Sequence, residues 1–346
     1  MSERKIKCVV WDLDNTLWDG VLLEDGEVTL NEACAQAVRV LDERGILHSI
    51  ASRNDPEAAM AQLKRFGMDE YFLHPQIGWE AKSESIAAIR QALNIGIDTF
   101  AFVDDQPFER EEVAFRHPEV LCLDAVEAAE LPGRPEFTPS TVTPDARARR
   151  EMYRSGIQRD QAEREFGGTP KEFLSSLDMT FTIFEAEEDD LPRAEELTVR
   201  TNQLNSTGIT YSLDEIREYA GAPDRLLLMA ELDDKYGSYG RIGLALVDCG
   251  QETWTLKLLL MSCRVISRGV GTILLHHIMR LARDNGVRLQ AEFRETPRNR
   301  AMFVTYRLAG FTRVAEGADD VAVLESDLGR IPPAPDHLRL RIGQRA

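Results

Sequence analysis

Short hydrophobic runs alternate with amphipathic stretches over the first 130 residues of the chain. The runs have the length of buried strands, and the stretches between them carry hydrophobic residues at helical spacing. Strands are therefore expected at 6–14, 46–52, 99–105 and 119–123, and helices at 31–44, 55–66 and 83–93. Because strands and helices alternate, this part of the chain is predicted to be an α/β domain built on a parallel sheet.

A proline-rich segment separates this pattern from a second one. Four prolines fall within 131–144, which predicts a linker, and 145–166 is a charged helical stretch expected to bridge two domains. The second pattern has strand-like runs at 179–184, 226–232, 242–248, 253–261 and 287–293, with helices after Gly269 and Pro297. We therefore predict an N-terminal domain over 1–130, a linker and bridging helix over 131–171, a C-terminal α+β domain over 172–330 and a tail over 331–346.

The composition is that of an ordinary globular protein. Of 346 residues, 43% are hydrophobic and 29% are charged, which excludes disordered, collagen-like and disulfide-stapled chains. No apolar stretch reaches the roughly 18 residues of a membrane span, and the N-terminus shows no secretory signal. The five cysteines are scattered without zinc-ligand spacing and indicate reduced thiols. A cytoplasmic protein is expected.

The charge of the chain is strongly negative but unevenly spread. The net charge is −18, which argues against nucleic acid and anionic membranes as partners. The segment 264–313 nevertheless holds ten arginines and three acids, a local charge of 10 − 3 = +7. This segment is either a set of solvated arginines or a docking face for an acidic or phosphate-bearing partner.

Polar residues fall at the carboxyl ends of the predicted strands. Asp12 and Asp14 end the first strand, and Asp104 and Asp105 end the third. In parallel sheets these ends share one edge, where ligands bind. Two acids at positions i and i+2 face one site, so one suits a nucleophile and the other an acid–base group. Close carboxylates repel unless a cation lies between them, and Mg²⁺ suits oxygen ligands.

Two further residues, Ser52 at the end of the second strand and Lys82, are placed to hold phosphate oxygens. The motifs DLDNT, ASRND, WEAK and FVDD, in this order, resemble the haloacid dehalogenase superfamily. The resemblance implies a Rossmann-like fold in which Asp12 forms an aspartyl phosphate and Asp14 is first the proton donor and then the base. It assigns phosphate binding to Thr16, Ser52, Arg53, Asn54 and Lys82, and Mg²⁺ binding to Asp12, the Asp14 carbonyl, Asp104 and Asp105.

The segment 18–30 bounds the size of any domain that covers this site. It contains Asp25-Gly26 between short apolar runs, which is a hairpin signal. A hairpin leaves no room for a large cap domain. The site is therefore expected to be open, or to be covered by the second domain.

A glycine-containing loop lies between a strand and a helix of the second domain. Such a loop lets backbone N–H groups approach a phosphate, and the helix N-terminus adds a favourable field. The loop resembles the RGxG pyrophosphate loop of GNAT acyltransferases, and Asn299, Tyr306 and Gly310-Phe311 resemble a later part of that fold. The resemblance implies a groove for the pantetheine arm of coenzyme A or of a carrier protein. The candidate pantetheine- and acyl-binding residues are Arg264, Arg268, Gly269, Val270, Gly271, Thr272, Asn202, Asn205 and Asn299.

Three features of the second domain have two interpretations each. Cys263 is either an acyl acceptor, whose thiolate nearby arginines favour, or a packing residue. Tyr306 is either a proton donor near the substrate thiol or a packing tyrosine. The polar cluster 200–207, which contains Asn202 and Asn205, either binds hydroxyl and phosphate groups or is a plain surface loop.

The phrases VWDLDNTLWDGVLLEDG, FVDDQPFEREEV, RTNQLNSTG and SCRVISRGVG resemble the FkbH-like family of polyketide pathways, over about residues 6–326. The resemblance implies a bifunctional glyceryl transferase and phosphatase. Its donor is 1,3-bisphosphoglycerate, its acceptor is the phosphopantetheine thiol of an acyl carrier protein, and the C3 phosphate is removed. Two other functions stay open: a small-molecule phosphatase with a partner-binding C-terminal domain, and an acetyl-CoA-dependent acetyltransferase.

Overall fold

The computed structural model describes residues 4–201, 203–317 and 320–343. The chain divides into two compact units, Met1–Arg154 and Ser155–Ala346. Among the described residues, no helix is both long and apolar enough to cross a membrane. The five cysteines form no disulfide.

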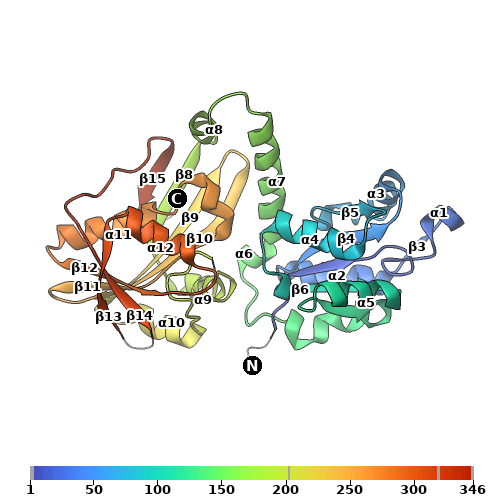
Figure 1. The fold of residues 1–346 in the computed structure, drawn as a ribbon, viewed down its shortest axis with the longest axis horizontal. Coiled ribbons are helices and arrows are strands. Elements are labelled where there is room, and N and C mark those ends of the chain that lie inside the picture. Colours follow the sequence, from blue (N-terminus) through green and yellow to red (C-terminus); the bar gives the residue numbers. More distant parts are fainter. Residues whose placement is uncertain (1–3, 202, 318–319, 344–346) are drawn as a thin grey trace. The chain divides into compact units, whose positions relative to one another are not determined.

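Unit 1 alternates strands with helices (Figure 1). Its elements are β1 (Cys8–Trp11), β2 (Trp18–Asp19), α1 (Leu22–Asp25), β3 (Thr29–Leu30), α2 (Glu32–Glu43), β4 (Leu47–Arg53), α3 (Pro56–Arg65), η1 (Asp69–Tyr71), β5 (Gln76–Gly78), α4 (Lys82–Leu93), η2 (Ile97–Thr99), β6 (Phe100–Asp104), α5 (Pro107–Arg116), β7 (Leu121–Asp124), η3 (Ala125–Gly133), η4 (Pro135–Phe137), α6 (Pro144–Arg147) and the start of α7 (Arg149–Glu165).

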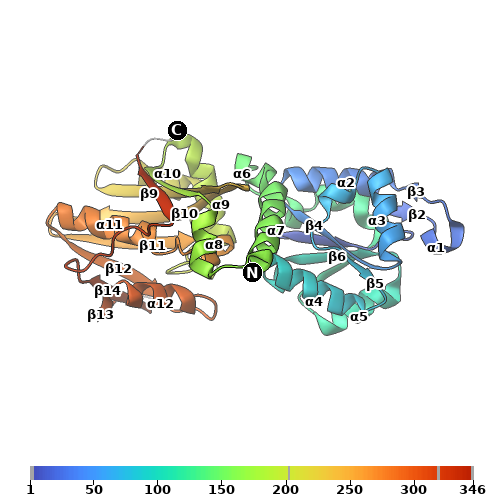
Figure 2. The same ribbon diagram turned by 90° about the horizontal axis from the view of Figure 1, so that it is seen from above.

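The main sheet of unit 1 is parallel, in the order β5-β4-β1-β6-β7. Figure 2 shows α2 and α3 on one face of this sheet and α4 and α5 on the other. Both faces are therefore covered, which explains why the strands are continuous hydrophobic runs. The carboxyl ends of β1, β4 and β6 lie next to one another at one edge, as the sequence predicts.

The segment between β1 and α2 is small. β2 and β3 pair antiparallel, so the predicted hairpin is present, although the helical turn α1 lies between its strands. Gly26 follows α1 with φ 72°, a conformation that glycine adopts without strain. Asn31 then caps α2 by accepting hydrogen bonds from the N–H groups of Ala33 and Cys34. No large cap domain is inserted here.

Unit 2 is built on a mixed sheet in the order β13-β14-β12-β11-β10-β9-β8-β15. Its elements are the end of α7, α8 (Pro170–Ser176), β8 (Met179–Glu185), η5 (Glu188–Asp190), α9 (Leu191–Arg200), α10 (Leu213–Ala220), β9 (Arg225–Asp234), β10 (Gly237–Cys249), β11 (Thr253–Met261), η6 (Cys263–Arg268), α11 (Ile273–Asp284), β12 (Arg288–Arg294), α12 (Arg300–Leu308), β13 (Phe311–Glu316), β14 (Val321–Ser326) and β15 (Leu338–Ile342).

Side-chain alternation along β9 divides unit 2 into two hydrophobic layers. Leu227 and Met229 pack with α9 and α10 on one face of the sheet. Leu228 and Ala230 pack with α11 and α12 on the other. Because successive strand residues point to opposite faces, one apolar strand serves both layers. The predicted fold class, a parallel α/β unit followed by a second α+β unit, is confirmed.

Two segments differ from the expectations for them. The proline-rich segment 131–144, expected to be a linker, packs against unit 1, because Leu131 and Phe137 are fully buried in the core of that unit. β15 lies inside the predicted tail 331–346 and pairs in parallel with β8. In both cases a few apolar side chains, spaced among polar residues, find a place on a core formed by distant parts of the chain.

Candidate active site

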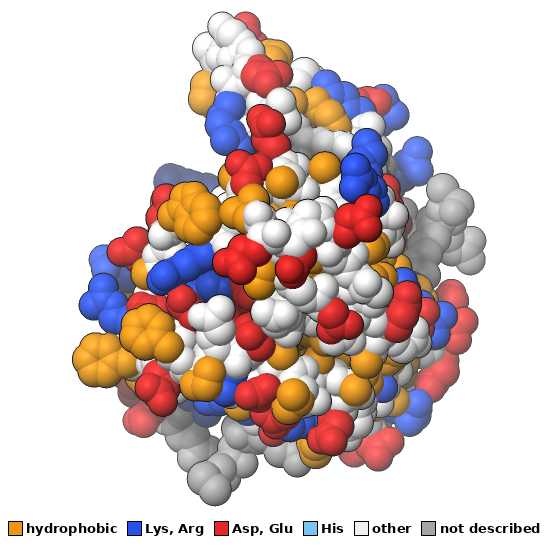
Figure 3. Space-filling view, turned by 90° about the vertical axis from the view of Figure 1, so that its right-hand side faces the viewer, with side chains coloured by type: hydrophobic (Ala, Val, Ile, Leu, Met, Phe, Trp, Pro, Cys, Tyr) orange, Lys and Arg blue, Asp and Glu red, His pale blue; other side chains and the backbone are white. Residues whose placement is uncertain are grey.

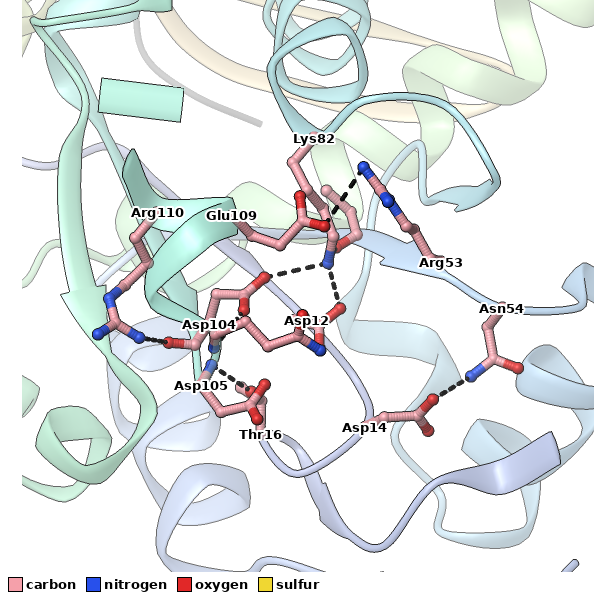
Figure 4. A network of polar contacts seen from close by, with 12 residues as sticks. Asp12, Asp14, Thr16, Arg53, Asn54, Lys82, Asp104, Asp105, Glu109 and Arg110 are labelled. Atoms are coloured by element: carbon pink, nitrogen blue, oxygen red, sulfur yellow. Dashed lines mark hydrogen bonds and ion pairs between the residues drawn. The ribbon is translucent and has the colours of Figure 1, made fainter. Parts of the chain in front are cut away.

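Asp12 lies at the edge of the sheet in unit 1, where β1 ends. Its backbone N–H donates to the Val103 carbonyl of β6 at 2.9 Å, which fixes the chain as it leaves the sheet. The Asp12 side chain is buried, and so are its neighbours Lys82 and Asp104. Figure 4 shows these three side chains pointing toward one another from β1, α4 and β6.

The Lys82 ammonium connects the acids of this site. Its Nζ donates to Asp12, to Asp104 Oδ2 at 3.1 Å and to the Ala51 carbonyl at 2.7 Å. An ammonium has three N–H donors, so all of them are used. Burial opposes the charged form of Lys82, but Asp12 and Asp104 outweigh it and raise its pKa.

Burial also changes the titration of Asp12. It raises the pKa of Asp12 to about 7, against the lowering effect of Lys82, and the charge of Asp104 adds to the rise. A carboxylate with little solvation is a stronger nucleophile than one in water, provided that a cation keeps it ionised. Lys82 supplies that positive charge in the structure.

Asp14 is oriented by three hydrogen bonds. Its Oδ1 accepts from the Trp18 indole Nε1 at 2.7 Å and from the Leu22 backbone N–H at 3.0 Å, both in the segment between β1 and α2. Its Oδ2 accepts from the Asn54 side-chain amide at 3.0 Å. Asn15, the residue after Asp14, has φ 53°, so the chain takes a left-handed turn directly after the second acid. The two carboxylates therefore occupy different surroundings, as a nucleophile and an acid–base group require.

Three acids at this edge fit a divalent cation. Carboxylate oxygens of Asp12, Asp104 and Asp105 all lie within 4.8 Å of one another. Asp105 Oδ1 is buried and has no hydrogen-bond partner among the described residues, so this acceptor lacks a positive group. Burial raises the pKa of Asp105, with the charge of Asp104 adding to the effect. Oxygen-only ligands with excess negative charge suit Mg²⁺. The Asp14 carboxylate is not part of this cluster.

The other residues predicted to bind phosphate also reach this edge. Thr16 is buried, and its hydroxyl accepts from the Asp105 N–H at 3.2 Å. Ser52 is buried at the end of β4, and Asn54 holds Asp14. Arg53 is partly exposed and forms an ion pair of 3.3 Å with Glu109. The structure thus brings together all the residues that the haloacid dehalogenase resemblance assigns.

Three supporting residues were not predicted from the sequence. Trp18 orients Asp14, Glu109 pairs with Arg53, and Arg110 donates to the Asp104 carbonyl at 2.6 Å while pairing with Asp124 at 2.7 Å. Glu109 and Arg110 lie in the first turns of α5, just after Asp104 and Asp105. Their position directly after the acidic pair places both residues near the site, but it does not indicate which partners their side chains contact. Nothing in the sequence indicated that the Trp18 indole turns back to Asp14.

The surface of unit 1 carries large hydrophobic side chains close to this site in the sequence. Figure 3 shows acidic side chains spread over one face of the protein, beside several large hydrophobic ones. Trp79 and Phe108 are each 68% exposed. Trp79 comes three residues before Lys82, and Phe108 comes just before Glu109.

The glycine-containing loop of unit 2 joins β11 to α11. Cys263, half-buried, begins the short helix η6, and Gly269 ends it with φ 69°. Val270 is buried, Thr272 precedes α11, and the space around a Cβ on Gly271 is open. Arg264 Nε donates to the Ser262 hydroxyl at 3.3 Å. The loop therefore has the strand–loop–helix setting that the sequence predicts.

Arg268 forms ion pairs with acidic residues of the protein itself. It is buried, and its guanidinium pairs with Asp160 at 3.2 Å and Glu163 at 3.0 Å, both on α7. At least three more arginines of 264–313 are ion-paired, namely Arg283, Arg288 and Arg313. The positive charge of this segment is thus partly neutralised by acids, among which Asp160, Glu163, Glu316 and Glu325 lie outside it.

The strands β11 and β12 separate toward their carboxyl ends, and residues 204–207 fill the interval. The parallel pairing of the strands ends at Leu256 and Ala291, although they continue to Met261 and Arg294. Ser206 N–H donates to the Leu259 carbonyl at 2.9 Å, and Met261 N–H donates to the Leu204 carbonyl at 2.9 Å. On the other side, Arg294 N–H donates to the Ser206 carbonyl at 3.0 Å.

Two of the predicted pantetheine-binding asparagines hold this segment. Asn205 Oδ1 accepts from the N–H groups of Thr207 and Gly208 at 3.1 and 2.8 Å. Asn299 Nδ2 donates to the carbonyls of Asn205 and Arg294 at 3.0 and 2.9 Å. Both asparagines are buried, so their amides hold the backbone rather than line an open groove. Asn202 lies outside the described residues.

Tyr306 is wholly buried in unit 2. Its ring packs edge-on against Phe311 and Phe293, with centroids 5.1 and 6.4 Å away. Burial raises the pKa of the Tyr306 phenol; the nearby Ser206 hydroxyl acts in the opposite direction, but the two hydroxyls do not meet hydrogen-bond geometry. In this conformation Tyr306 has the surroundings of a packing residue.

No protein-family model matches the chain, and no curated protein matches it. Among solved structures, the chain is similar to the N-terminal part of protein BF1531 from Bacteroides fragilis, which contains a phosphatase domain complexed with Mg, at 30% identity and a TM-score of 0.33. That likeness covers 37% of this chain and 39% of the other.

The chain is also similar to the ribosomal-protein-S18-alanine N-acetyltransferase of Escherichia coli, at 19% identity and a TM-score of 0.35, over 45% of this chain and 97% of the other. A GNAT-family acetyltransferase from Streptococcus pneumoniae gives 22% identity and a TM-score of 0.32, over 42% of this chain and 98% of that one.

Proposed function

We propose that unit 1 is a Mg²⁺-dependent phosphatase with Asp12 as its nucleophile. The observation that carries the proposal is the arrangement of two differently held carboxylates at one sheet edge. Asp12 is buried against Lys82, and Asp14 is oriented by Asn54, Trp18 and Leu22. A packing role does not require two acids in such different surroundings beside a third and a fourth acid.

The residues divide the reaction between them. An Asp12 oxygen attacks phosphorus, the bond from phosphorus to the leaving oxygen breaks, and Asp14 gives its proton to that oxygen. Asp14 then takes a proton from water, whose oxygen attacks phosphorus and frees Asp12 and inorganic phosphate. Lys82, Thr16 and Ser52 face the negative oxygens of the transferred group. When bound by Asp12, Asp104 and Asp105, Mg²⁺ supplies positive charge that offsets the phosphate and the acids.

We propose further that the whole chain is an FkbH-like glyceryl transferase and phosphatase of polyketide biosynthesis. In this scheme a thiol attacks the acyl carbon of 1,3-bisphosphoglycerate, the bond from that carbon to the phosphate oxygen breaks, and a thioester forms. The acceptor is the phosphopantetheine of an acyl carrier protein, with Cys263 in unit 2 as a candidate relay. Unit 1 removes the C3 phosphate. The motifs of both units support this scheme, and its substrates belong to the cytoplasm.

The placement of segment 204–207 bears on the transfer step. Its hydrogen bonds occupy the edge of β11 that faces β12, and β11 leads directly into the loop whose resemblance implies a pantetheine groove. A carrier-bound arm therefore reaches unit 2 by moving this segment or by a path outside the interval between β11 and β12. The solvent-accessible part of η6, which includes Cys263, is a starting point for the second path.

The test is the intact mass of a phosphopantetheinylated carrier protein after incubation with the protein, Mg²⁺ and enzymatically generated 1,3-bisphosphoglycerate. A gain of one glyceryl unit without phosphate supports both activities. The Asp12→Asn protein should load phosphoglycerate and keep the phosphate. Asp69→Asn, a partly exposed aspartate of η1 outside the site, is the matched control and should behave like the wild type.

The alternatives predict other results. Phosphate release from small esters without any mass gain on the carrier supports a stand-alone phosphatase. Transfer of acetyl from acetyl-CoA, insensitive to Mg²⁺, supports an acetyltransferase. Absence of Mg²⁺-dependent phosphate release from every ester tested overturns the assignment of Asp12.

A further inference from the structure

Arg53, which the sequence assigns to phosphate binding, lies at the edge of the Asp12 site and has no role in the reaction steps proposed above. Residues on both sides of Arg53 contact the site. Ala51, in β4, accepts a hydrogen bond from Lys82, and Asn54, directly after β4, donates one to Asp14. The backbone therefore fixes Arg53 at the site. The Arg53 side chain is 44% exposed, so much of it is accessible from solvent.

The Arg53 side chain is held by a buried partner. Glu109 Oε1 lies 3.3 Å from Arg53 Nη2, and the Glu109 side chain is 5% exposed. A buried carboxylate is stable only beside positive charge, so Glu109 keeps Arg53 at this position. Glu109 Oε2 is buried without a hydrogen-bond partner among the described residues, so this oxygen can still accept a hydrogen bond. Figure 4 shows the Arg53 side chain pointing toward Glu109.

The other cations of the site are already committed. Lys82 uses all three of its donors on Asp12, Asp104 and the Ala51 carbonyl. Arg110 is bound to the Asp104 carbonyl and to Asp124. Arg53 pairs through one guanidinium nitrogen with a single carboxylate oxygen and keeps donors for a ligand.

Resting on the proposed phosphatase function, we propose that Arg53, positioned by Glu109, selects phosphate monoesters whose leaving group carries a second negative charge. An acyl phosphate or a free carboxylate meets this requirement, and a neutral thioester does not. Phosphate removal then acts on the glyceryl unit before its other end becomes a thioester. The protein carries −18 overall, so without Arg53 a second negative charge would weaken binding.

The test compares 3-phosphoglycerate with glycerol 3-phosphate, which share the phosphate and differ in the carboxylate. The wild type should favour 3-phosphoglycerate in kcat/KM. In Arg53→Gln, the ratio of the two kcat/KM values should fall about tenfold, the effect of one charged hydrogen bond. Arg53→Lys should keep most of the ratio, and Glu109→Gln should lower it through KM. Arg65→Gln, which removes an exposed arginine from the last turn of α3, is the matched control.

Each outcome decides the proposal. A wild type without preference for 3-phosphoglycerate, or an Arg53→Gln ratio equal to that of the wild type, overturns it. If neither ester is hydrolysed, the phosphatase assignment fails separately. Calorimetric binding of both esters to the Asp12→Asn protein then decides the role of Arg53: tighter binding of 3-phosphoglycerate supports it, and equal or weaker binding overturns it. The wild-type and Arg53→Lys measurements retain this test if Arg53→Gln does not fold.

Discussion

The Asn54 side-chain amide donates a hydrogen bond of 3.0 Å to Asp14 Oδ2. The two residues come from the ends of neighbouring strands, β4 and β1, so the sheet itself sets their separation. Because Trp18 and Leu22 donate to the other oxygen, Asp14 is held from both sides. Its orientation is therefore a property of several elements rather than of the DLDNT motif alone.

Asn54→Ala should slow phosphate-ester hydrolysis through kcat more than through KM. A hydrogen bond to a charged group contributes about 1.5–3 kcal/mol, so we expect a loss of roughly 10- to 100-fold. Trp18→Phe removes a different donor to the same carboxylate while keeping an aromatic ring, and should act in the same direction. Steady-state kinetics measure both. An unchanged kcat in both variants would show that Asp14 needs neither donor.

Lys82→Met should destabilise unit 1. The substitution leaves Asp12 and Asp104 buried without their cation, and breaking a buried pair costs about 3–5 kcal/mol. Urea unfolding in EDTA measures the loss, and added Mg²⁺ should recover part of it because the ion restores positive charge. Lys64→Met, on the exposed side of α3, should change the free energy of unfolding by less than about 0.5 kcal/mol. Equal stability of Lys82→Met and wild type in EDTA would contradict this account.

His48 should make the stability of the protein depend on pH. Burial lowers the pKa of His48 to about 3, and its Nδ1 accepts from the Trp11 indole at 3.0 Å. The unfolded chain then binds a proton below its ordinary pKa of about 6.5, whereas the folded protein stays neutral down to pH 3. The contribution of neutral His48 to the free energy of unfolding is therefore fully present above pH 6.5 and is lost as the pH falls below that value.

This residue contributes a slope of at most about 1.4 kcal/mol per pH unit between those values. His48→Asn keeps an acceptor for Trp11 but does not titrate, so its unfolding free energy should vary less between pH 6.5 and 4. Denaturant unfolding over a pH series checks the difference. Parallel curves for the two proteins would mean that His48 is solvated in the folded state.

Asn299→Ala should loosen segment 204–207. The variant removes three hydrogen bonds of the Asn299 side chain, to the carbonyls of Asn205 and Arg294 and from the N–H of Thr296, at a cost of about 2–4 kcal/mol. The Met261 amide, which donates to the Leu204 carbonyl, should exchange its hydrogen faster. Exposed Asn285→Ala, which loses one bond to the Leu281 carbonyl, is the control and should leave that exchange rate unchanged.

The sequence predicted the edge of unit 1 well because parallel strands share their carboxyl ends. Once β1, β4 and β6 were placed, Asp12, Ser52 and Asp104 had to meet. The contact between Glu109 and Arg53 could not be predicted in this way, because nothing in the first turn of α5 indicates that the Glu109 side chain turns inward. The burial of Arg268 against α7 was equally invisible, since a charged residue beside a glycine-rich loop is typical of a ligand site as well.

The second unit was harder to predict because its important contacts are distant in the sequence. Asn205 and Asn299 meet through the backbone between β11 and β12, and no local pattern reports such a contact. β15 did carry a signal, the alternation of Leu338, Leu340 and Ile342 with arginines. That pattern indicates an edge strand, but the prolines that precede it in the segment 331–346 led to the prediction of a tail.

Segment 204–207 also competes with any extended ligand for the backbone hydrogen-bonding groups of β11 in unit 2. Leu259 and Met261 already have partners on the side of β11 that faces β12, supplied by the same polypeptide. A tethered occupant competes at a high effective concentration, about millimolar for a short flexible linker. An external chain that pairs with this edge therefore binds only if it brings additional contacts elsewhere. By the same logic, the segment shields a strand edge that would otherwise be open to pairing between molecules.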